Sequence, residues 1–491
     1  MHYKAIVLIS AFFLFSSSFI APGKKTNTRI YKDILKDVEK HGQAFSNLKN
    51  VTHTIGHRLT GSKNGSEAEA FALNLFKEYG YTNAQFLPFE VKSWSRNKVT
   101  LDIVPDNSDN FREVKVVSLA HSPLSANLSA PIVDCKDGLE SDFAKVQDDL
   151  KGKFALFNVD VQSPENKGKK NLHRSEKTAF AIQHGAAGVI LVNKVKGNVL
   201  LTGTASVTGE LIDIPAVCIS YESGRAIRNW IKDEKHILAQ VDMLNYYRPV
   251  RPRNVSATYP GQKKYENEKI VIGAHLDSWD LAQGAVDNGL GAFSVIDIAR
   301  VFKTLKLKTK RPIEFVLFMG EEQGLLGSKQ YVNQAKASGE IDKIALMVNL
   351  DMLNNCKGFN TFGDSDLADI AQRVGNDIKS VDPDFKNQHT SHAGLHSDHQ
   401  PFMLNGIPIC SPNGELSQKA IDCYHADCDS FDLINESEIN KNVKYTAMLL
   451  YALANADKLP KRKSDFEIRD YLIAQNLKKE LIIGKDWRWA E

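Results

Sequence analysis

The chain has 491 residues, of which 42% are hydrophobic and 25% are charged, so it is long enough for two or three ordinary globular domains. Its formal net charge of +3 gives no electrostatic support to a nucleic-acid partner. The six cysteines include no C-x-x-C pair, which argues against a structural zinc site.

The first residues predict an export signal. Lys4 precedes an apolar run from Ile6 to Phe15, and small residues follow as far as Ala21. The run is too short to span a bilayer, and no other stretch of the sequence qualifies as a membrane helix. We therefore expect a signal peptide over residues 1–21 and a secreted or periplasmic mature protein without a stable membrane anchor.

The beginning of the mature chain is predicted to form part of a main domain. Apolar positions at helical spacing favour a helix over 28–49. Ser66 and Glu69 form a capping box that predicts a second helix. Strand-like runs follow at 84–91 and 98–104.

The character of the sequence changes between residues 116 and 247. Short β-rich runs alternate with predicted helices, one of them over 176–184. A linker rich in proline and arginine, 248–253, follows this stretch. We therefore predict a small β-rich domain inserted into the main one, which comprises 28–115 and 248–458.

Strands and helices alternate after the linker. The predicted strands are 269–274, 313–319, 344–350 and 407–410, and the predicted helices are 290–305, 327–337, 366–378 and 436–456. Because the strands are almost continuously apolar, the pattern favours an α/β fold with a mixed, mostly parallel sheet covered by helices on both faces. The tail, 459–491, is predicted to be helical, with a capping box formed by Ser464 and Glu467.

Cys423 and Cys428 are the best-placed pair of cysteines for a disulfide. They stand close together in the sequence, and export would permit the bond. The other cysteines can equally be plain buried thiols.

Side chains of the metal-ligand type follow the ends of successive predicted strands. In chain order they are His275 and Asp277, Asp287 in a glycine-rich turn, Glu321 and Glu322, Asp351, and His425. Functional groups in open α/β sheets gather beyond the carboxyl ends of the strands. Two adjacent carboxylates, such as Glu321 and Glu322, repel each other unless a cation lies beside them. The pattern therefore predicts one shared site.

The composition of this set suits zinc, which takes mixed nitrogen and oxygen ligands. Asp287 is placed to bridge two ions, because its glycine-rich turn lets the backbone approach closely. Asp277 suits a supporting role, accepting the second ring N–H of His275. A His-x-Asp pair alone would indicate a surface ion pair, and Glu-Glu alone a solvated face. Their joint occurrence at successive strand ends favours a two-metal site.

The segment from His389 to His399 contains four histidines. It could form a second metal site, but we expect a loop that lines the cleft.

Three strings of residues resemble the co-catalytic zinc exopeptidases, a family of aminopeptidases and glutamate carboxypeptidases. They are His275-Leu-Asp-Ser-Trp-Asp280, Gln283-Gly-Ala-Val-Asp-Asn-Gly-Leu-Gly-Ala292 and Gly320-Glu-Glu-Gln-Gly-Leu-Leu-Gly327. The plasma glutamate carboxypeptidase branch is the most similar, and the turn Gly56–Ser62 resembles its early motif. The β-rich domain resembles the protease-associated insert of this family. The tail has no counterpart that we recognise.

The resemblance implies a role for each residue of the site. One zinc would be held by His275 and Asp351, another by Glu322 and His425, with Asp287 bridging them through a turn whose Asp287–Asn288 peptide is cis. Glu321 would be the general base, and Asp277 would orient His275. Tyr424 and Asp398 are candidates for contacts with the substrate or the oxyanion.

The resulting functional prediction is an exported di-zinc exopeptidase. It would hydrolyse the amino-terminal bond of short peptides or dipeptides through a metal-activated water. A homodimer is one assembly that we expect. One alternative is a carboxypeptidase that releases a carboxy-terminal acidic residue, although no arginine cluster adjoins the metal motifs in the sequence. Further alternatives are a ligand-binding homologue without catalysis and a single-zinc glutaminyl cyclase.

Overall fold

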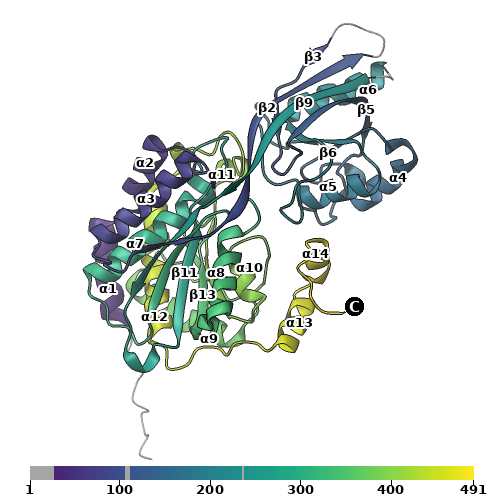
Figure 1. The fold of residues 1–491 in the computed structure, drawn as a ribbon. Coiled ribbons are helices and arrows are strands. Elements are labelled where there is room, and N and C mark those ends of the chain that lie inside the picture. The colour runs from purple at the N-terminus through teal and green to yellow at the C-terminus, as the bar shows by residue number, and fades with distance from the viewer. Residues whose placement is uncertain (1–26, 106–110, 235–236, 491) are drawn as a thin grey trace, which may run out of the picture.

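The computed structural model describes residues 27–105, 111–234 and 237–490 of the chain. The expected signal peptide over 1–21 lies outside these residues. None of the described helices has the length and apolar character needed to cross a membrane. Two sheets organise the described chain, with helices packed on both (Figure 1).

The first sheet has seven strands in the order β1-β10-β12-β11-β13-β15-β14. Their bounds are β1 Gln85–Pro88, β10 Arg253–Tyr259, β11 Lys269–His275, β12 Ile313–Phe318, β13 Ile344–Asn349, β14 Gly358–Asn360 and β15 Ile409–Asn413. The four central strands, β12, β11, β13 and β15, run parallel. The remaining pairings are antiparallel, so the predicted mixed sheet with a parallel centre is confirmed.

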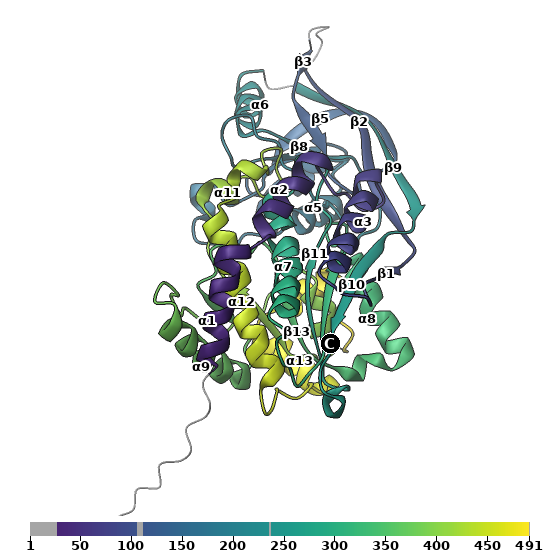
Figure 2. The ribbon, with the colours of Figure 1, turned by 90° about the vertical axis from the view of Figure 1, so that its left-hand side faces the viewer.

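Helices cover both faces of this sheet because its strands are apolar on both sides. One face packs against α1 Thr28–His41, α2 Ala44–Thr54, α3 Lys63–Glu78, α7 Leu290–Thr304, α9 Ser365–Val381 and α12 Glu436–Asn455 (Figure 2). The opposite face packs against α8 Leu326–Ser338 and α10 His399–Met403. Alternation along β11 assigns the faces: Ile270 and Ile272 join the first core and Val271 the second.

Two local predictions near the start of the chain are wrong. The helix expected over 28–49 breaks after His41 into α1 and α2. The second helix is capped by Ser62, whose Oγ accepts a hydrogen bond from Gly65 N at 2.9 Å, and not by Ser66. Glu69 is bound instead by Arg253 from the distant strand β10, with 2.6 Å between Arg253 Nε and Glu69 Oε2.

The second sheet has eight strands in the order β3-β2-β9-β5-β6-β7-β8-β4. Their bounds are β2 Val91–Pro105, β3 Arg112–Glu113, β4 Val116–Ser118, β5 Ser125–Asp134, β6 Phe154–Asn158, β7 Gly188–Val192, β8 Ala216–Ile219 and β9 Ile237–Val250. The helices of this part are α4 Glu140–Leu150, α5 Arg174–Gln183 and α6 Tyr221–Glu234. We call residues 91–250 the insert.

The insert begins earlier in the chain than the expected boundary at residue 116. Strand β2 pairs with β9 over nearly its whole length, so it belongs to the second sheet. The long β2–β9 ribbon also joins the insert to the first sheet (Figure 1). The sequence pattern assigned the β2 segment to the main domain, because its partner strand β9 lies more than a hundred residues later in the chain.

The tail forms two short helices, α13 Asp465–Ala474 and α14 Lys478–Ile483. The capping box expected at Ser464 and Glu467 is present. Both helices lie on the same side of the first sheet as α8 and α10, below the insert in Figure 1. Another short helix, α11 Gln418–Asp422, precedes the Cys423–Cys428 disulfide, and the disulfide confirms the predicted pairing. The other four cysteines are buried thiols.

Candidate metal centre

The three central strands β11, β12 and β13 end in step at one edge of the first sheet. His275 closes β11 beside Phe318 of β12, and Gly273 of β11 pairs with Asn349 of β13. Each strand therefore delivers its following residues to the same place. Gly320 makes the turn after β12 with φ of +80°, and a Cβ there would lie 2.9 Å from the Leu326 side chain. This turn directs Glu321 and Glu322 back over the edge.

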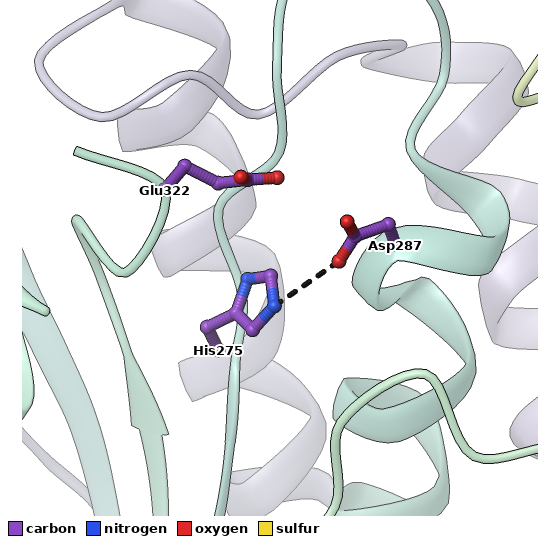
Figure 3. A group of neighbouring side chains, drawn as sticks. All are labelled: His275, Asp287 and Glu322. Atoms are coloured by element: carbon purple, nitrogen blue, oxygen red, sulfur yellow. Dashed lines mark ion pairs between the residues drawn. The ribbon is translucent and has the colours of Figure 1, made fainter. Parts of the chain in front are cut away.

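Asp287 lies between the two histidines. Its Oδ1 is 3.2 Å from His275 Nε2, and its Oδ2 is 3.0 Å from His425 Nε2 (Figure 3 draws the His275 contact). The other oxygens complete the arrangement, since Asp351 Oδ1 is 3.4 Å from His275 Nε2 and Glu322 Oε2 is 3.0 Å from His425 Nε2. The five side chains predicted as ligands are thus brought together around one carboxylate.

The electrostatics of this group call for a cation. Burial raises the pKa of Glu321 well above its usual range, and Asp351 and Glu322 raise it further against the opposing effect of His275. Burial alone would lower the pKa of His275, but the carboxylates of Glu321 and Asp351 outweigh it and raise that pKa well above its ordinary value. Glu322 Oε1 is buried and has no hydrogen-bond partner among the described residues. Ligand type, spacing and this unpaired oxygen fit a bound metal ion.

His275 is held in the tautomer that a metal needs. Its Nδ1 lies 3.1 Å from the backbone oxygen of Asp277, which can only accept, so Nδ1 carries a proton and Nε2 is the ring nitrogen that a metal ion would bind. The Asp277 carboxylate is farther from this nitrogen, at 3.7 Å. It instead accepts hydrogen bonds from Thr60 Oγ1 and Glu321 N. Asp277 therefore contacts both His275 and the Glu321 backbone.

Arg58 supports the backbone of this region, and the sequence alone did not predict that role. It is fully buried and donates to three carbonyl oxygens: Leu276 at 2.6 Å, Gln283 at 2.8 Å and Gly284 at 2.7 Å. These carbonyls flank His275 and the Asp287 turn. The signal was available in the Gly56–Ser62 turn, but only the fold shows what the guanidinium binds.

Asp429 supports the Asp287 turn from the other side. Its carboxylate accepts hydrogen bonds from Val286 N at 2.8 Å and Asp287 N at 3.0 Å. Burial raises the pKa of Asp429 to about 7. The Asp287–Asn288 peptide bond is cis, as the family resemblance implied.

The insert contributes a cation that the sequence did not place here. Arg174, at the start of α5, is 6% exposed, and its Nη2 lies 2.7 Å from His425 Nδ1. In the part of the chain that the structure describes, its Nε has no hydrogen-bond partner and no carboxylate pairs with it. Gly203 leaves room for the guanidinium, because a Cβ there would lie 1.9 Å from Arg174 Nη2. The cationic side chain that the sequence near the metal motifs lacked therefore comes from the insert, 251 residues before His425.

A cavity of about 390 Å³ opens over these side chains, and we call it the main cavity. Its walls include the five expected ligands, Glu321 and Tyr424, together with Arg174 and His173 of the insert. The Tyr424 ring stacks on His425 with 4.0 Å between centroids. Asp398 does not line the cavity. It is wholly buried, and burial raises its pKa to about 7.

The histidine-rich segment 389–399 behaves as a loop beside the cavity. His396 and His399 line the main cavity, whereas His389 points to Asn387 and to the backbone of Phe359. The metal-type cluster found among the described residues comprises His275, Asp287 and Glu322, and none of these loop histidines. The expected cleft-lining role agrees with this placement.

Comparisons with known proteins match both parts of the molecule. Residues 254–450 match the family described as Peptidase family M28, and residues 128–227 match the PA domain. Carboxypeptidase Q of Bos taurus is 23% identical over 462 residues, which cover 89% of this chain and 94% of that protein.

Two solved structures share the architecture. A Peptidase M28 precursor from Shewanella amazonensis SB2B superposes with a TM-score of 0.76 at 24% identity, over 89% of this chain and 99% of that one. A zinc aminopeptidase from Bacillus subtilis superposes with a TM-score of 0.65 at 22% identity, over 86% of this chain and 96% of that one. At these identities the likeness establishes a common fold.

Proposed function

Since this chain is a member of peptidase family M28 that carries a PA domain, we propose that it is a di-zinc exopeptidase acting on short peptides. The observation that carries the proposal is the position of Asp287, whose two oxygens face two different histidines at 3.0–3.2 Å. His275 with Asp351 would hold one zinc, and Glu322 with His425 the other. The similar Bacillus protein is itself described as a zinc enzyme. Bound zinc would make a water acidic and polarise the scissile carbonyl.

Glu321 is assigned as the general base. It lines the main cavity and is not needed as a ligand, because each histidine already has a carboxylate partner besides Asp287. The backbone of Glu321 is fixed by its N–H, which donates to Asp277 Oδ1 at 3.2 Å. Its carboxylate would take a proton from the attacking water and deliver it to the leaving amine. Tyr424 lines the same cavity, and its hydroxyl would donate a hydrogen bond to the developing oxyanion.

The test of this assignment is Glu321→Gln. The amide keeps the shape of the side chain but cannot accept the proton, so peptide hydrolysis is expected to fall by roughly 10²–10⁴-fold. Zinc content, measured by inductively coupled plasma mass spectrometry, should stay near two ions per chain. Glu340→Gln, which changes an exposed glutamate paired with Lys343, should leave both quantities unchanged. Retained hydrolysis in the Glu321 variant would exclude it as the base.

Arg174 favours a second candidate function, in which the enzyme recognises the carboxy terminus of its peptide substrate. Burying a guanidinium without a carboxylate partner costs free energy, and the carboxylate of a bound substrate would supply that partner. In this structure Arg174 donates to His425 Nδ1, which leaves the ring proton on Nε2. A metal on Nε2 requires the proton on Nδ1 instead, and Arg174 could then no longer donate there. The guanidinium would be free for a carboxylate, as a dipeptidase or a carboxypeptidase needs.

We further propose that the protein is exported. The Cys423–Cys428 disulfide suits an oxidising compartment and lies in the loop that carries His425.

A further inference from the structure

We propose that the C-terminal strap, defined as residues 465–489, limits the length of peptide that the main cavity accepts. This inference rests on the proposed peptidase function. It concerns residues outside the metal centre, in the segment for which the sequence showed no role.

The strap is anchored by its apolar side. Ile468, Leu472, Leu477 and Leu481 are all buried in the core on the α8 and α10 face of the first sheet. Tyr471 OH also donates to the carbonyl of Phe362 at 2.6 Å, and Phe362 lines the main cavity. The strap is therefore part of the folded domain and not a loose extension.

The strap also reaches the insert. Glu480 of α14 forms an ion pair with Lys170, in the loop before α5. Its neighbour Lys479 pairs with Glu140 at 3.5 Å, through two side chains that are largely exposed. Since α5 begins at Arg174, the strap connects the first-sheet domain to the segment of the insert that enters the site.

A small annex of about 90 Å³ leads from the main cavity to the strap. The two spaces share the walls His173, Thr204, Gly324, Leu325, Leu395 and His396. The far wall of the annex is formed by strap residues: Glu480, Leu481, Ile483, Gly484 and Asp486. The annex has less than a quarter of the volume of the main cavity, about 90 Å³ against about 390 Å³. It can take the end of a peptide but not several further residues.

The annex adjoins a larger outer cavity of about 540 Å³, and one hydrogen bond joins two residues that line both spaces. Gln400 Nε2 donates to Asp486 Oδ2 at 2.9 Å, and both residues line the annex and the outer cavity. The same Gln400 accepts from His396 N at 2.8 Å through its Oε1. Asp486 thus closes the passage and also supports the loop that carries His396. Removing its carboxylate would join the two cavities.

The experiment measures the length preference of the zinc-loaded protein. The probes are unblocked alanine peptides of two to five residues, and kcat/KM is measured for each. The unaltered protein should prefer the shortest peptides, and Asp486→Ala should reduce the preference for dialanine over pentaalanine by about tenfold. Lys170→Glu, which repels Glu480, should act in the same direction, and Lys170→Glu with Glu480→Lys should restore the preference. Arg469→Ala, which removes a strap cation paired with its neighbour Asp470 and outside the annex lining, is the control and should change nothing.

Two results would overturn the proposal: equal use of all lengths by the unaltered protein, or an unchanged preference in both Asp486→Ala and Lys170→Glu. Binding of the same peptides to the Glu321→Gln protein, measured by calorimetry, separates the strap from the catalytic assignment. If no peptide is hydrolysed, the proposed function fails, while the binding series with and without Asp486→Ala still reports the length limit. An affinity that does not depend on length in either protein would then reject the strap's role.

Discussion

Arg58 lies beneath the metal centre, with its guanidinium shared among three backbone carbonyls. Burial lowers its pKa, and the charges of Asp429, Asp277, Asp287 and Glu322 oppose that shift. Arg58 therefore holds together the two loops that carry His275 and Asp287, and its charge interacts with the carboxylate cluster. We class it as a positioning residue, since it does not line the main cavity.

Replacing Arg58 should weaken metal binding. Arg58→Met would leave the three carbonyls unpaired and let the His275 and Asp287 loops move apart. Supporting residues of metal ligands typically contribute 10–100-fold in affinity, so zinc affinity should fall by about that factor. The measurement is competition with a chromophoric chelator, together with thermal unfolding of the metal-free protein.

The matched control for this prediction is Arg311→Met. Arg311 is also buried, and it binds Glu268 and the carbonyl of Ala456 away from the site. Its loss should lower the unfolding temperature while zinc affinity stays unchanged. If the two variants lose zinc affinity equally, the effect of Arg58 is general destabilisation and not positioning.

At the scale of elements, the site depends on how α5 is presented. The loop before α5 is held by Asp137, whose buried carboxylate accepts from Gln162 N at 3.0 Å, from Ser163 N and from the side chains of Asn158 and Asn166. Burial alone would raise the pKa of Asp137, but these hydrogen bonds outweigh it and lower the pKa to about 2. The ionised Asp137 carboxylate therefore holds this loop in place, and we call it the Asp137 anchor.

The Asp137 anchor predicts a dependence of stability on pH. Its folded-state pKa is below the ordinary value of 3.8, so ionised Asp137 stabilises the fold above that pH. The contribution should be lost as pH falls from about 4 toward about 2. Asp137→Asn should reduce the free energy of unfolding by roughly 1–3 kcal/mol at neutral pH, measured by urea denaturation.

The difference between the unaltered protein and Asp137→Asn should shrink below about pH 4. Asp160→Asn changes a more exposed carboxylate nearby, paired with Lys194, and should have a much smaller effect. A difference that stays constant down to pH 2 would rule out ionised Asp137 as its source.

At the scale of the whole molecule, three parts that are separate in sequence meet at one cavity. The first-sheet domain supplies the metal-type residues, the insert supplies His173 and Arg174, and the strap closes the annex. Neither domain alone would hold both the proposed metal centre and the proposed cation for a substrate carboxylate. We therefore expect the relative position of the domains to affect specificity.

Arg174→Ala tests this division of roles. If the guanidinium binds the substrate carboxylate, kcat/KM for a free dipeptide should fall by roughly 10–100-fold, the loss of a charge-assisted hydrogen bond. The same dipeptide with a carboxy-terminal amide should be affected by no more than about twofold. Lys194→Ala, which removes another cation of the insert, is the control. An equal loss for acid and amide would show that Arg174 does not recognise the carboxylate.

Much of the fold could be predicted because its signals are local. Ligand-type side chains lie at or just after the ends of three apolar central strands, β11, β12 and β13, so strand ends and candidate site residues were predicted together. The Cys423–Cys428 pair is also local. Helix ends near the amino terminus were misplaced, because Gly65 selects Ser62 as the cap and Glu69 is taken by Arg253 from another element.

The order of residues by itself determined the chemistry of the ligand set, the parallel centre of the sheet and the existence of an insert. Only the tertiary structure decided that β2 belongs with β9, that Arg58 binds two loops, that Arg174 reaches His425, and that Gln400 binds Asp486 beside the annex. The physical reason is the distance along the sequence over which each kind of interaction acts. Periodicity and turn chemistry act over a few residues, whereas a buried cation or a closing hydrogen bond depends on partners that only folding brings within 3 Å.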